Sequence, residues 1–495
     1  MISSSSSLSH PPTSSADPRR IEPEESLDPD NRRYGAPFWL AYASNTLVCV
    51  ALALLYRYAD LILLLGGTEL HLGWIIGLGW IGSLGMRLFL GKGIDCYGTR
   101  RIWLGSLAIF VACCLAHLGL ASCHGPVIYL LRIAQCTAMA GIFGASTTFI
   151  AGRAAGPRMA ELIGMLGTSG FIGMMLGTQL GDLLCGADPS SRGVFAMFTA
   201  AGLLGTAAIP FAWTASRREK APARRNRLPM LWVVRRYHPG MLLAVGVVTG
   251  AALSVPSTFL RTYAAELGIP RIGLFFTVVG LTAVATRVAS RRLPQRFGLA
   301  PILLIGLAVM ALAQLLFLTV QSEWQLIVPG LVHGVAQAIL YPMVTAAGSS
   351  TFPSRYRGLG TTLILASLDI GQLIGAPAAG MVLHLSEAAG WASYPTMFLA
   401  MSAVLSLVAG VYALSLRRTG TAHGGSNGRA LRRRVNGVAT GLKPGLVVRR
   451  PAAPAPKAFP QSSPDEAARS GTEPAGPLTC RQAGGSNRST AAGLR

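Results

Sequence analysis

Long apolar segments recur along most of this chain, and they constrain its fold more than any other feature. Each is about 20 residues long, which is enough for a helix to cross the roughly 30 Å hydrocarbon core of a bilayer. Twelve are present, at about 37–65, 71–91, 102–122, 126–150, 161–185, 194–215, 239–263, 272–290, 301–320, 324–348, 358–384 and 392–416. Because backbone groups inside a bilayer must bond within their own segment, the sequence predicts an all-α membrane protein with twelve transmembrane helices.

The composition supports this prediction. Hydrophobic residues make up 51% of the chain and charged residues only 13%, whereas soluble proteins carry about 25% charged residues. Residues 1–36 and 417–495 are rich in polar residues, Pro, Gly or charge and lack an apolar core. We therefore expect both segments to be disordered, and the first is not a signal peptide.

The net charge of +23 is unevenly distributed, which argues against a nucleic-acid partner. Arginines and lysines gather in the connection at 216–238 and in the other turns that follow even-numbered segments. The turns that follow odd-numbered segments hold only Arg57, Arg192, Arg261 and Arg271. This bias predicts a multi-pass protein of the inner membrane with both termini, the 216–238 linker and the tail in the cytoplasm. We expect the basic face to contact anionic lipids.

A polar stretch between the second and third segments is the most distinctive motif. It holds, in order, Gly91, Asp95, Gly98, Arg100 and Arg101. Glycines allow a tight turn, and a carboxylate can accept hydrogen bonds from helix N-termini or arginines. The stretch therefore predicts a short loop with a gating role, in which Asp95 also pairs with Arg87, an arginine one turn before the loop.

The two halves of the chain repeat one another. Arg87, Asp95 and Gly98 correspond to Arg287, Gln295 and Gly298, each 200 positions later. The run Gly173-Met-Met-Leu-Gly177 corresponds to Gly371-Gln-Leu-Ile-Gly375, 198 positions later. The repeat predicts two pseudo-symmetric six-helix bundles, at 37–215 and 239–416.

Several motifs together resemble the major facilitator superfamily. The spacing from Gly91 to Arg101 resembles the family's loop signature between its second and third helices. Arg132-Ile-Ala-Gln135 resembles its Arg-x-x-Gln-Gly element, with Cys136 in place of the glycine. The Gly173–Gly177 run resembles an antiporter element, with Thr178 where proline is expected.

In the second half, the pairs His333-Gly334 and Tyr341-Pro342 and the run Asp369-Ile-Gly371 resemble bacterial efflux permeases of this superfamily. The resemblance covers roughly residues 37–416. It implies the major facilitator fold, with a substrate site near the midplane between the two halves.

Ionisable residues within the apolar segments are candidates for proton coupling, because such groups are costly in a bilayer and usually face a cavity or a partner. Asp369 lies about eleven residues into its segment, near the midplane. Arg132 and His333 are the cationic candidates for coupling to it. For each of the three, a purely structural role is the alternative.

The remaining candidates are a gate, a cavity and a packing surface. Arg87 and Arg287 lie one turn before their loops and are predicted to reach the cytoplasmic interface and act as gates. In the helices that line the cavity in this family, the uncommon polar residues are Asn45, Gln135, Thr258, Gln337 and Tyr341. Close helix packing, including sliding of the two halves, is predicted at Gly167, Gly170, Gly173, Gly177, Gly181, Gly371 and Gly375.

The chain lacks the sequence motifs of several other function classes. The chain has no GxxxxGK[ST], HExxH or GxSxG pattern, and the GxGxxG at Gly77–Gly82 lies within an apolar segment, where it indicates helix packing. The cysteines lack metal-ligand spacing, and a disulfide between Cys123 and Cys185 is left open. We therefore expect no enzyme activity, cofactor or metal.

The sequence predicts a monomeric secondary active transporter that moves a small organic solute by alternating access, as proton-coupled efflux. Two alternatives remain open: a proton- or cation-coupled metabolite importer, and a transporter-like membrane sensor. A sealed apolar interface between the halves would favour the sensor.

Overall fold

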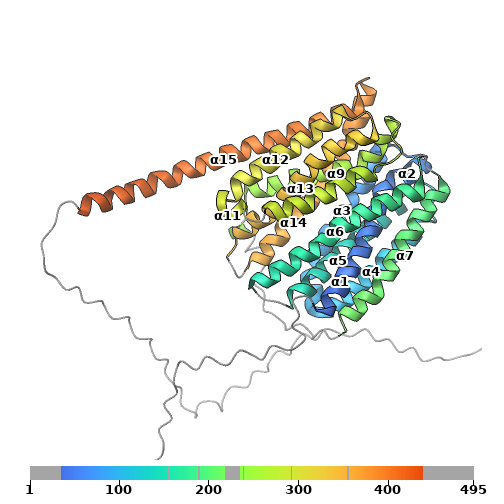
Figure 1. Cartoon of the computed structure of the whole chain (residues 1–495), viewed down its shortest axis with the longest axis horizontal. Coiled ribbons are helices and arrows are strands. Elements are labelled where there is room, and N and C mark those ends of the chain that lie inside the picture. Colours follow the sequence, from blue (N-terminus) through green and yellow to red (C-terminus); the bar gives the residue numbers. More distant parts are fainter. Residues whose placement is uncertain are drawn as a thin grey trace, which may run out of the picture. The chain divides into compact units, whose positions relative to one another are not determined.

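The described part of the chain is helical throughout. The structure is a computed structural model that describes residues 35–153, 156–187, 190–217, 235–237, 239–290, 293–353 and 356–438 (Figure 1). The first half contains α1 (Ala36–Leu54), α2 (Tyr58–Leu64), α3 (Glu69–Tyr97), α4 (Thr99–His117), α5 (Pro126–Ala151), α6 (Gly156–Cys185) and α7 (Ser191–Ala215). The second contains α9 (Met241–Glu266), α10 (Gly273–Ser290), α11 (Leu293–Phe297), α12 (Leu299–Leu316), α13 (Ile327–Ser350), α14 (Arg357–Ala388) and α15 (Ser393–Val438).

The predicted all-helical membrane fold is confirmed. Eleven helices within the described residues are long and apolar enough to cross a membrane. The remaining predicted segment is α6, a 30-residue helix with seven glycines that packs against α1 and α10. The residues 1–34, 218–234 and 439–495, on which most of the predicted tails and linker fall, lie outside the described residues.

The two halves use the same helix pairings. In the first half α1 packs on α6, α3 on α5, and α4 on α5; in the second, α9 packs on α14, α10 on α13, and α12 on α13. Two further pairs join the halves, α3 with α14 and α6 with α10. These two interfaces are equivalent in the repeat, because α3 of the first half corresponds to α10 of the second, and α6 corresponds to α14.

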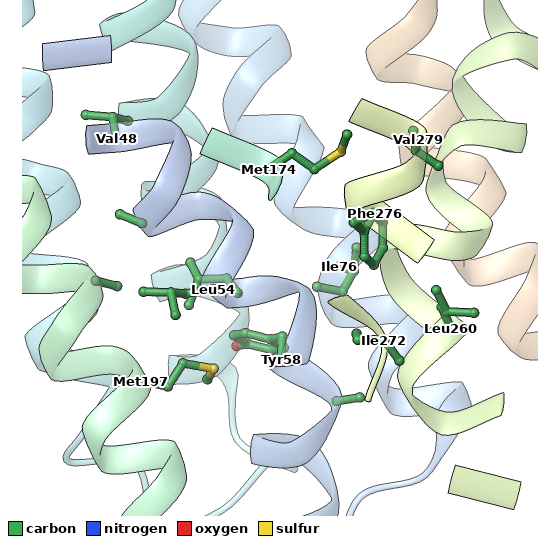
Figure 2. Close-up of a cluster of buried hydrophobic side chains, with 14 of the residues drawn as sticks. Val48, Leu54, Tyr58, Ile76, Met174, Met197, Leu260, Ile272, Phe276 and Val279 are labelled. Carbon is green, nitrogen blue, oxygen red and sulfur yellow. The ribbon is translucent and has the colours of Figure 1, made fainter. Parts of the chain in front are cut away.

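One cluster of buried apolar side chains contains residues of both halves, and a second lies within the second half. Figure 2 shows Tyr58 and Met197 of the first half in the same cluster as Ile272 and Phe276 of the second. Glycines let the helices approach closely at the boundary: a Cβ on Gly73 would lie 2.6 Å from the carbonyl oxygen of Ala376. The turns α2–α3, α6–α7, α9–α10 and α14–α15 lie at the end of the bundle that we call the outer end, following the charge-based prediction.

Some elements differ from the predicted ones. The first segment is not one continuous helix, because a 3₁₀ turn at Leu55–Arg57 separates α1 from α2. α15 continues to Val438, beyond the predicted end at 416. The described residues up to Gly425 form one compact unit, and the rest of α15 belongs to a second. Cys123 and Cys185 are both free thiols, so the disulfide left open above is not formed.

Candidate functional site

An ion pair joins the two halves in the middle of the α3–α14 interface. Arg87 Nε donates to Asp369 Oδ2 at 2.5 Å and Arg87 Nη2 to Oδ1 at 2.9 Å. The hydroxyl of Ser83, one turn earlier on α3, donates to Asp369 Oδ2 at 2.6 Å. Asp369 lies twelve residues after Arg357, the first residue of α14, or about 18 Å along the helix. The pair is bidentate, which fixes its geometry as well as its charge.

The partner predicted for Arg87 was wrong. Asp95 lies in the last turns of α3, eight residues from Arg87, which is about 12 Å along the helix axis. Asp369, on the facing helix, is level with Arg87 instead. The Arg87 side chain is only 23% exposed, so it does not extend to the cytoplasmic interface as predicted. A gating role for Asp95 itself stays a prediction.

The repeat-related arginine, Arg287, has a different environment. Its guanidinium carbon lies 4.9 Å from the centre of the Phe171 ring on α6. A Cβ on Gly167 would meet its Nη1 at 3.4 Å, so this glycine leaves room for the guanidinium. The Nε atom is buried without a hydrogen-bond partner. Arg287 therefore packs between α10 and α6, and the predicted pairing with a loop acid or a helix end was wrong.

Tyr341 on α13 lies near both of these arginines. It is close to Arg87, Asp369 and Arg287, and it is 40% exposed. The structure thus brings together four of the predicted residues, although they were predicted for three separate roles. We call Ser83, Arg87, Asp369, Arg287, Tyr341 and Phe171 the central site.

A second group of charges links the halves near the outer end. Arg57 Nε donates to Asp60 Oδ2 at 2.6 Å, and Arg261 Nε of α9 lies 2.9 Å from Asp60 Oδ1. Asp182 of α6 accepts from Arg57 Nη1 at 3.3 Å and from the backbone N–H groups that begin α10, those of Ile272 at 2.9 Å and Gly273 at 2.6 Å. We call Arg57, Asp60, Asp182 and Arg261 the outer ion network.

The outer ion network is almost completely excluded from solvent, since no member is more than 6% exposed. Backbone carbonyls complete it: Gly186 accepts from Arg57 at 2.8 Å, and Ala187 from Arg261 at 2.7 Å. Two arginines face two carboxylates, so the charges balance. Such a group holds the closed arrangement of the helices that it joins, because separating its members would leave buried charges unpaired.

Sequence reasoning did not find this network. Arg57 and Arg261 were taken as turn residues, and neither Asp60 nor Asp182 was singled out. The available signal was an acid within or at the end of an apolar segment, with an arginine three residues before Asp60. The missing information was the contact between segments, because Asp60 and Arg261 are 201 positions apart.

The predicted loop is shorter than expected. Gly91 and Asp95 are helical, because α3 continues to Tyr97. The turn is made by Gly98, with φ +79°, and its repeat counterpart Gly298 has φ +77°. This left-handed region is accessible mainly to glycine, which explains why both halves carry one there. Of the basic pair, Arg100 packs over the ring of Trp213 at 3.9 Å, and Arg101 is exposed.

The two cations predicted to couple with Asp369 do not contact it. Arg132 Nη1 donates to Gln135 Oε1 at 2.7 Å, and its guanidinium lies 5.0 Å from the Tyr58 ring. His333 is buried against Phe275, with its Nδ1 unpartnered. Neither Arg132 nor His333 therefore pairs with Asp369 in this structure, and a proton-coupling role for them stays a prediction. Arg87 pairs with Asp369 because it lies on the helix that faces α14.

The polar residues predicted for the cavity are separated. Asn45, Gln135 and Thr258 are buried, at 3%, 1% and 4% exposure, whereas Gln337 is half-buried. None of them lines the cavity of about 320 Å³ at the outer end, whose walls include Glu69, Glu266, His384, Glu387 and Tyr394. Tyr341 alone of the predicted set lies beside the central site.

Four of the predicted packing glycines make close contacts within their own half, whereas Gly167 faces Arg287 of the other half. Gly173 and Gly177 approach Cys49 and Val50 of α1, and Gly371 and Gly375 approach Val247 and Ala251 of α9. Gly170 faces open space, and Gly181 makes only ordinary contacts with Arg57 and Leu54. Sliding of the halves on this glycine run stays a prediction, and of the run Gly167 alone has a contact across the boundary among its nearest neighbours. The close contacts between the halves are made by other glycines, such as Gly73, Gly77 and Gly280.

Comparisons with known proteins agree with this architecture. The nucleoside transporter NupG superposes with a TM-score of 0.60 at 14% identity, covering 77% of this chain and 98% of that one. A bacterial homolog of the human lysosomal transporter Spinster, in an inward-facing and unoccupied conformation, gives a TM-score of 0.58 at 13% identity, covering 77% and 96%.

A curated relative supplies a functional name. The cephamycin export protein CmcT of Amycolatopsis lactamdurans is 28% identical over 240 residues, which is 48% of this chain and 46% of that protein. The match thus spans less than half the length of this relative. The model of the Major Facilitator Superfamily matches residues 38–298 and 242–459. Together with the helical fold and its internal repeat, this match shows that the chain belongs to the Major Facilitator Superfamily of transporters.

Proposed function

We propose that this transporter is a proton-coupled exporter of a small organic solute that works by alternating access. The observation that carries the proposal is the Arg87–Asp369 pair, which joins the two halves at mid-depth and remains partly open to solvent. Asp369 itself is buried, so an acid held between two moving bodies in this way can bind a proton when the bodies separate and release it when the arginine returns. Export is supported by the name of the curated relative.

The two charged groups suggest how the halves alternate. The outer ion network closes the outer end through contacts of Asp60 and Asp182 with α9 and α10. Opening that end requires these contacts to break, whereas the Arg57–Asp60 pair stays within the first half. The network is therefore a candidate for the outer gate, and the Arg87–Asp369 pair for the coupling site.

The interface between the halves favours a transporter over a sensor. A sensor that never opens gains most from an apolar interface, because buried ion pairs rarely stabilise a protein more than apolar residues of similar volume. Both boundary interfaces instead carry charges: Arg87 with Asp369 on α3 and α14, and Asp182 on α6 beside the start of α10. Charged contacts that can be broken and re-formed fit a cycle of two states.

The coupling role of Asp369 can be tested with Asp369→Asn. A thermal-shift screen of the purified protein against drug and metabolite panels, at two pH values, first identifies a ligand. Proteoliposomes then report proton release on addition of that ligand. The variant should lose gradient-driven movement but retain binding and exchange, because the amide keeps the shape of the side chain without its proton. Glu387→Gln, at an exposed acid near the outer end of the same helix, is the control. Unchanged proton release by the Asp369 variant would assign this acid a structural role.

The proposed orientation places both termini in the cytoplasm. Single cysteines introduced at Ser190 and at Gly425, in a background without the exposed Cys96 and without Cys480, report it through an impermeant thiol reagent. In intact cells the first position should react and the second should not. Reaction at the second position alone would reverse the topology.

A further inference from the structure

The internal repeat places two arginines at equivalent positions, but only one of them has a counter-ion. Arg87 and Arg287 are 200 positions apart, and Asp369 and Phe171 are 198 apart, the same offsets that relate the loop motifs and the glycine runs of the two halves. Arg87 of α3 pairs with Asp369 of α14. Its counterpart Arg287 of α10 faces Phe171 of α6, where the repeat would place a carboxylate.

The residue that donates a hydrogen bond to Asp369, Ser83, also lacks an equivalent in the second half. Ser83, which donates its hydroxyl to Asp369, corresponds to Ala283, which is fully buried and has no hydrogen-bonding side chain. One interface thus has Ser, Arg and Asp, and the other has Ala, Arg and Phe at the equivalent positions. The second interface keeps the arginine but lacks both the carboxylate and the hydroxyl group that donates to it.

The charge at the central site is consequently unbalanced. Two arginines, Arg87 and Arg287, face one carboxylate, Asp369, and the bidentate contact of Asp369 is made entirely to Arg87. Within the described residues no carboxylate pairs with Arg287, and its buried Nε has no acceptor. An unpaired charge that is largely removed from water is costly unless a ligand supplies the opposite charge.

The surroundings of Arg287 suit a ligand that carries an aromatic or apolar body. The Phe171 ring lies against the guanidinium, and Tyr341, 40% exposed, adds a second aromatic group with a hydroxyl. Arginine presents a planar fork of donors that matches a carboxylate in a bidentate geometry. Access is provided because both Arg287 and Tyr341 are incompletely buried.

We propose that Arg287 is the anion-binding subsite of this transporter, and that the solute it carries supplies the carboxylate that Phe171 replaces in the repeat. The inference rests on the proposed transport function and adds to it the chemical class of the solute, an organic carboxylate with an apolar body. Arg87 and Asp369 remain a matched pair beside it, and the bound carboxylate brings the site to charge balance.

The missing counter-ion can be tested without any ligand. Phe171→Asp and Phe171→Asn differ only in charge, and each is made with Arg287 intact and in the R287Q background. With Arg287 intact, the Asp variant should melt at a higher temperature than the Asn variant, because it completes the ion pair of the repeat. In the R287Q background the order should reverse. Equal melting of the two variants in both backgrounds would overturn the proposal.

Binding is tested with matched probes, since the natural solute is unidentified. Benzoate and phenylacetate are compared with benzamide and phenylacetamide by thermal shift of the detergent-purified full-length chain at pH 7.5. At least one carboxylate should protect the wild-type protein, and its amide should not. R287Q should weaken that protection by about ten- to hundred-fold in apparent affinity, as expected for charge-assisted hydrogen bonds. Arg192→Gln, at an exposed arginine, should leave it unchanged.

The same assay separates a solute from a lipid headgroup, which could also supply an oxyanion. Phosphatidylglycerol is titrated into the micelles in place of the carboxylates. Protection by phosphatidylglycerol that depends on Arg287, without protection by any carboxylate, would assign the site to a lipid and overturn the solute proposal. Equal protection by acids and amides, protection that survives R287Q, or no protection by either probe would also overturn it.

Binding at equilibrium requires no gradient, so these outcomes are independent of the transport proposal. Carboxylate protection without proton release in proteoliposomes would contradict proton coupling and leave the subsite intact. Proton release driven by a neutral solute would support proton coupling and contradict the anion-binding subsite.

Discussion

The outer ion network and the central site both join the two halves, yet their charges are arranged differently. In the network, two arginines and two carboxylates balance, and no side chain is more than 6% exposed. In the central site, Arg87 is 23% exposed, Tyr341 is 40% exposed, and Arg287 has no carboxylate among the described residues. A buried cluster with balanced charges is suited to stabilising one conformational state. An unbalanced cluster whose arginine and tyrosine are incompletely buried suits a site whose occupants change.

This contrast predicts that the same substitution has unequal effects in the two regions. Asp60→Asn should lower the free energy of unfolding by about 3–5 kcal/mol, because it leaves the buried Arg57 and Arg261 with a neutral neighbour. Asp369→Asn should cost about 1–2 kcal/mol, since the Arg87 side chain is 23% exposed and an amide can still accept from Ser83. Denaturant unfolding in mixed micelles measures both variants.

Two further measurements sharpen the comparison. Arg192→Gln, at an exposed position near the same outer end, should change stability by no more than about 0.5 kcal/mol. Asp60→Asn should also increase thiol labelling of Cys185, which lies near the network, because the outer end opens more often. If Asp60→Asn and Asp369→Asn lower the free energy of unfolding by the same amount, the proposed difference between the outer ion network and the central site is wrong.

An intermediate effect is expected for Asp182→Ala. The substitution leaves the N–H groups of Ile272 and Gly273 without their acceptor, which should cost about 2–3 kcal/mol. Because those groups begin α10, the loss should appear as faster amide hydrogen exchange in the first turn of that helix. Exchange that is faster across the whole chain, and not locally, would show that Asp182 supports the fold in general and does not hold the boundary.

Among the residues of the two charged sites, the smallest effect is expected for Ser83→Ala at the central site. Asp369 keeps both bonds to Arg87, so the loss should be about 1 kcal/mol. The informative comparison is with Ala283→Ser at the repeat-related position, which restores the hydroxyl of the triad without a carboxylate to accept from it. That variant should give no stabilisation. A gain of stability from Ala283→Ser would indicate that the second interface has an acceptor for the added hydroxyl.

Segment-level features of this protein were predictable from the sequence. The helix positions followed from apolar length, because the bilayer core sets the length of any spanning segment. Gly98 and Gly298 were predicted as turn residues, and both have positive φ angles. Asp369 was recognised because an acid within an apolar segment is rare enough to be noticed in the sequence alone.

Partners across the boundary between the halves were not predictable. Sequence proximity suggested Asp95 for Arg87, and composition suggested Arg132 and His333 for Asp369, but the contact is between Arg87 and Asp369, 282 positions apart. A helix rotates by about 100° per residue, so small differences in how two helices dock decide which side chains meet. The same limit explains why Gly173 and Gly177, predicted to face the other half, pack against α1 of their own half.

The apolar segments, their repeat and the charged residues among them could be read from the amino-acid sequence, because the energetic cost of polar groups in a bilayer acts on each segment separately. The pairing of the charges depended on how the helices pack. It matched Arg57 and Arg261 with Asp60, matched Arg87 with Asp369, and left Arg287 against Phe171. Electrostatic pairing depends on distances of a few ångströms between segments that are far apart in the chain, and those distances exist only after the halves have packed.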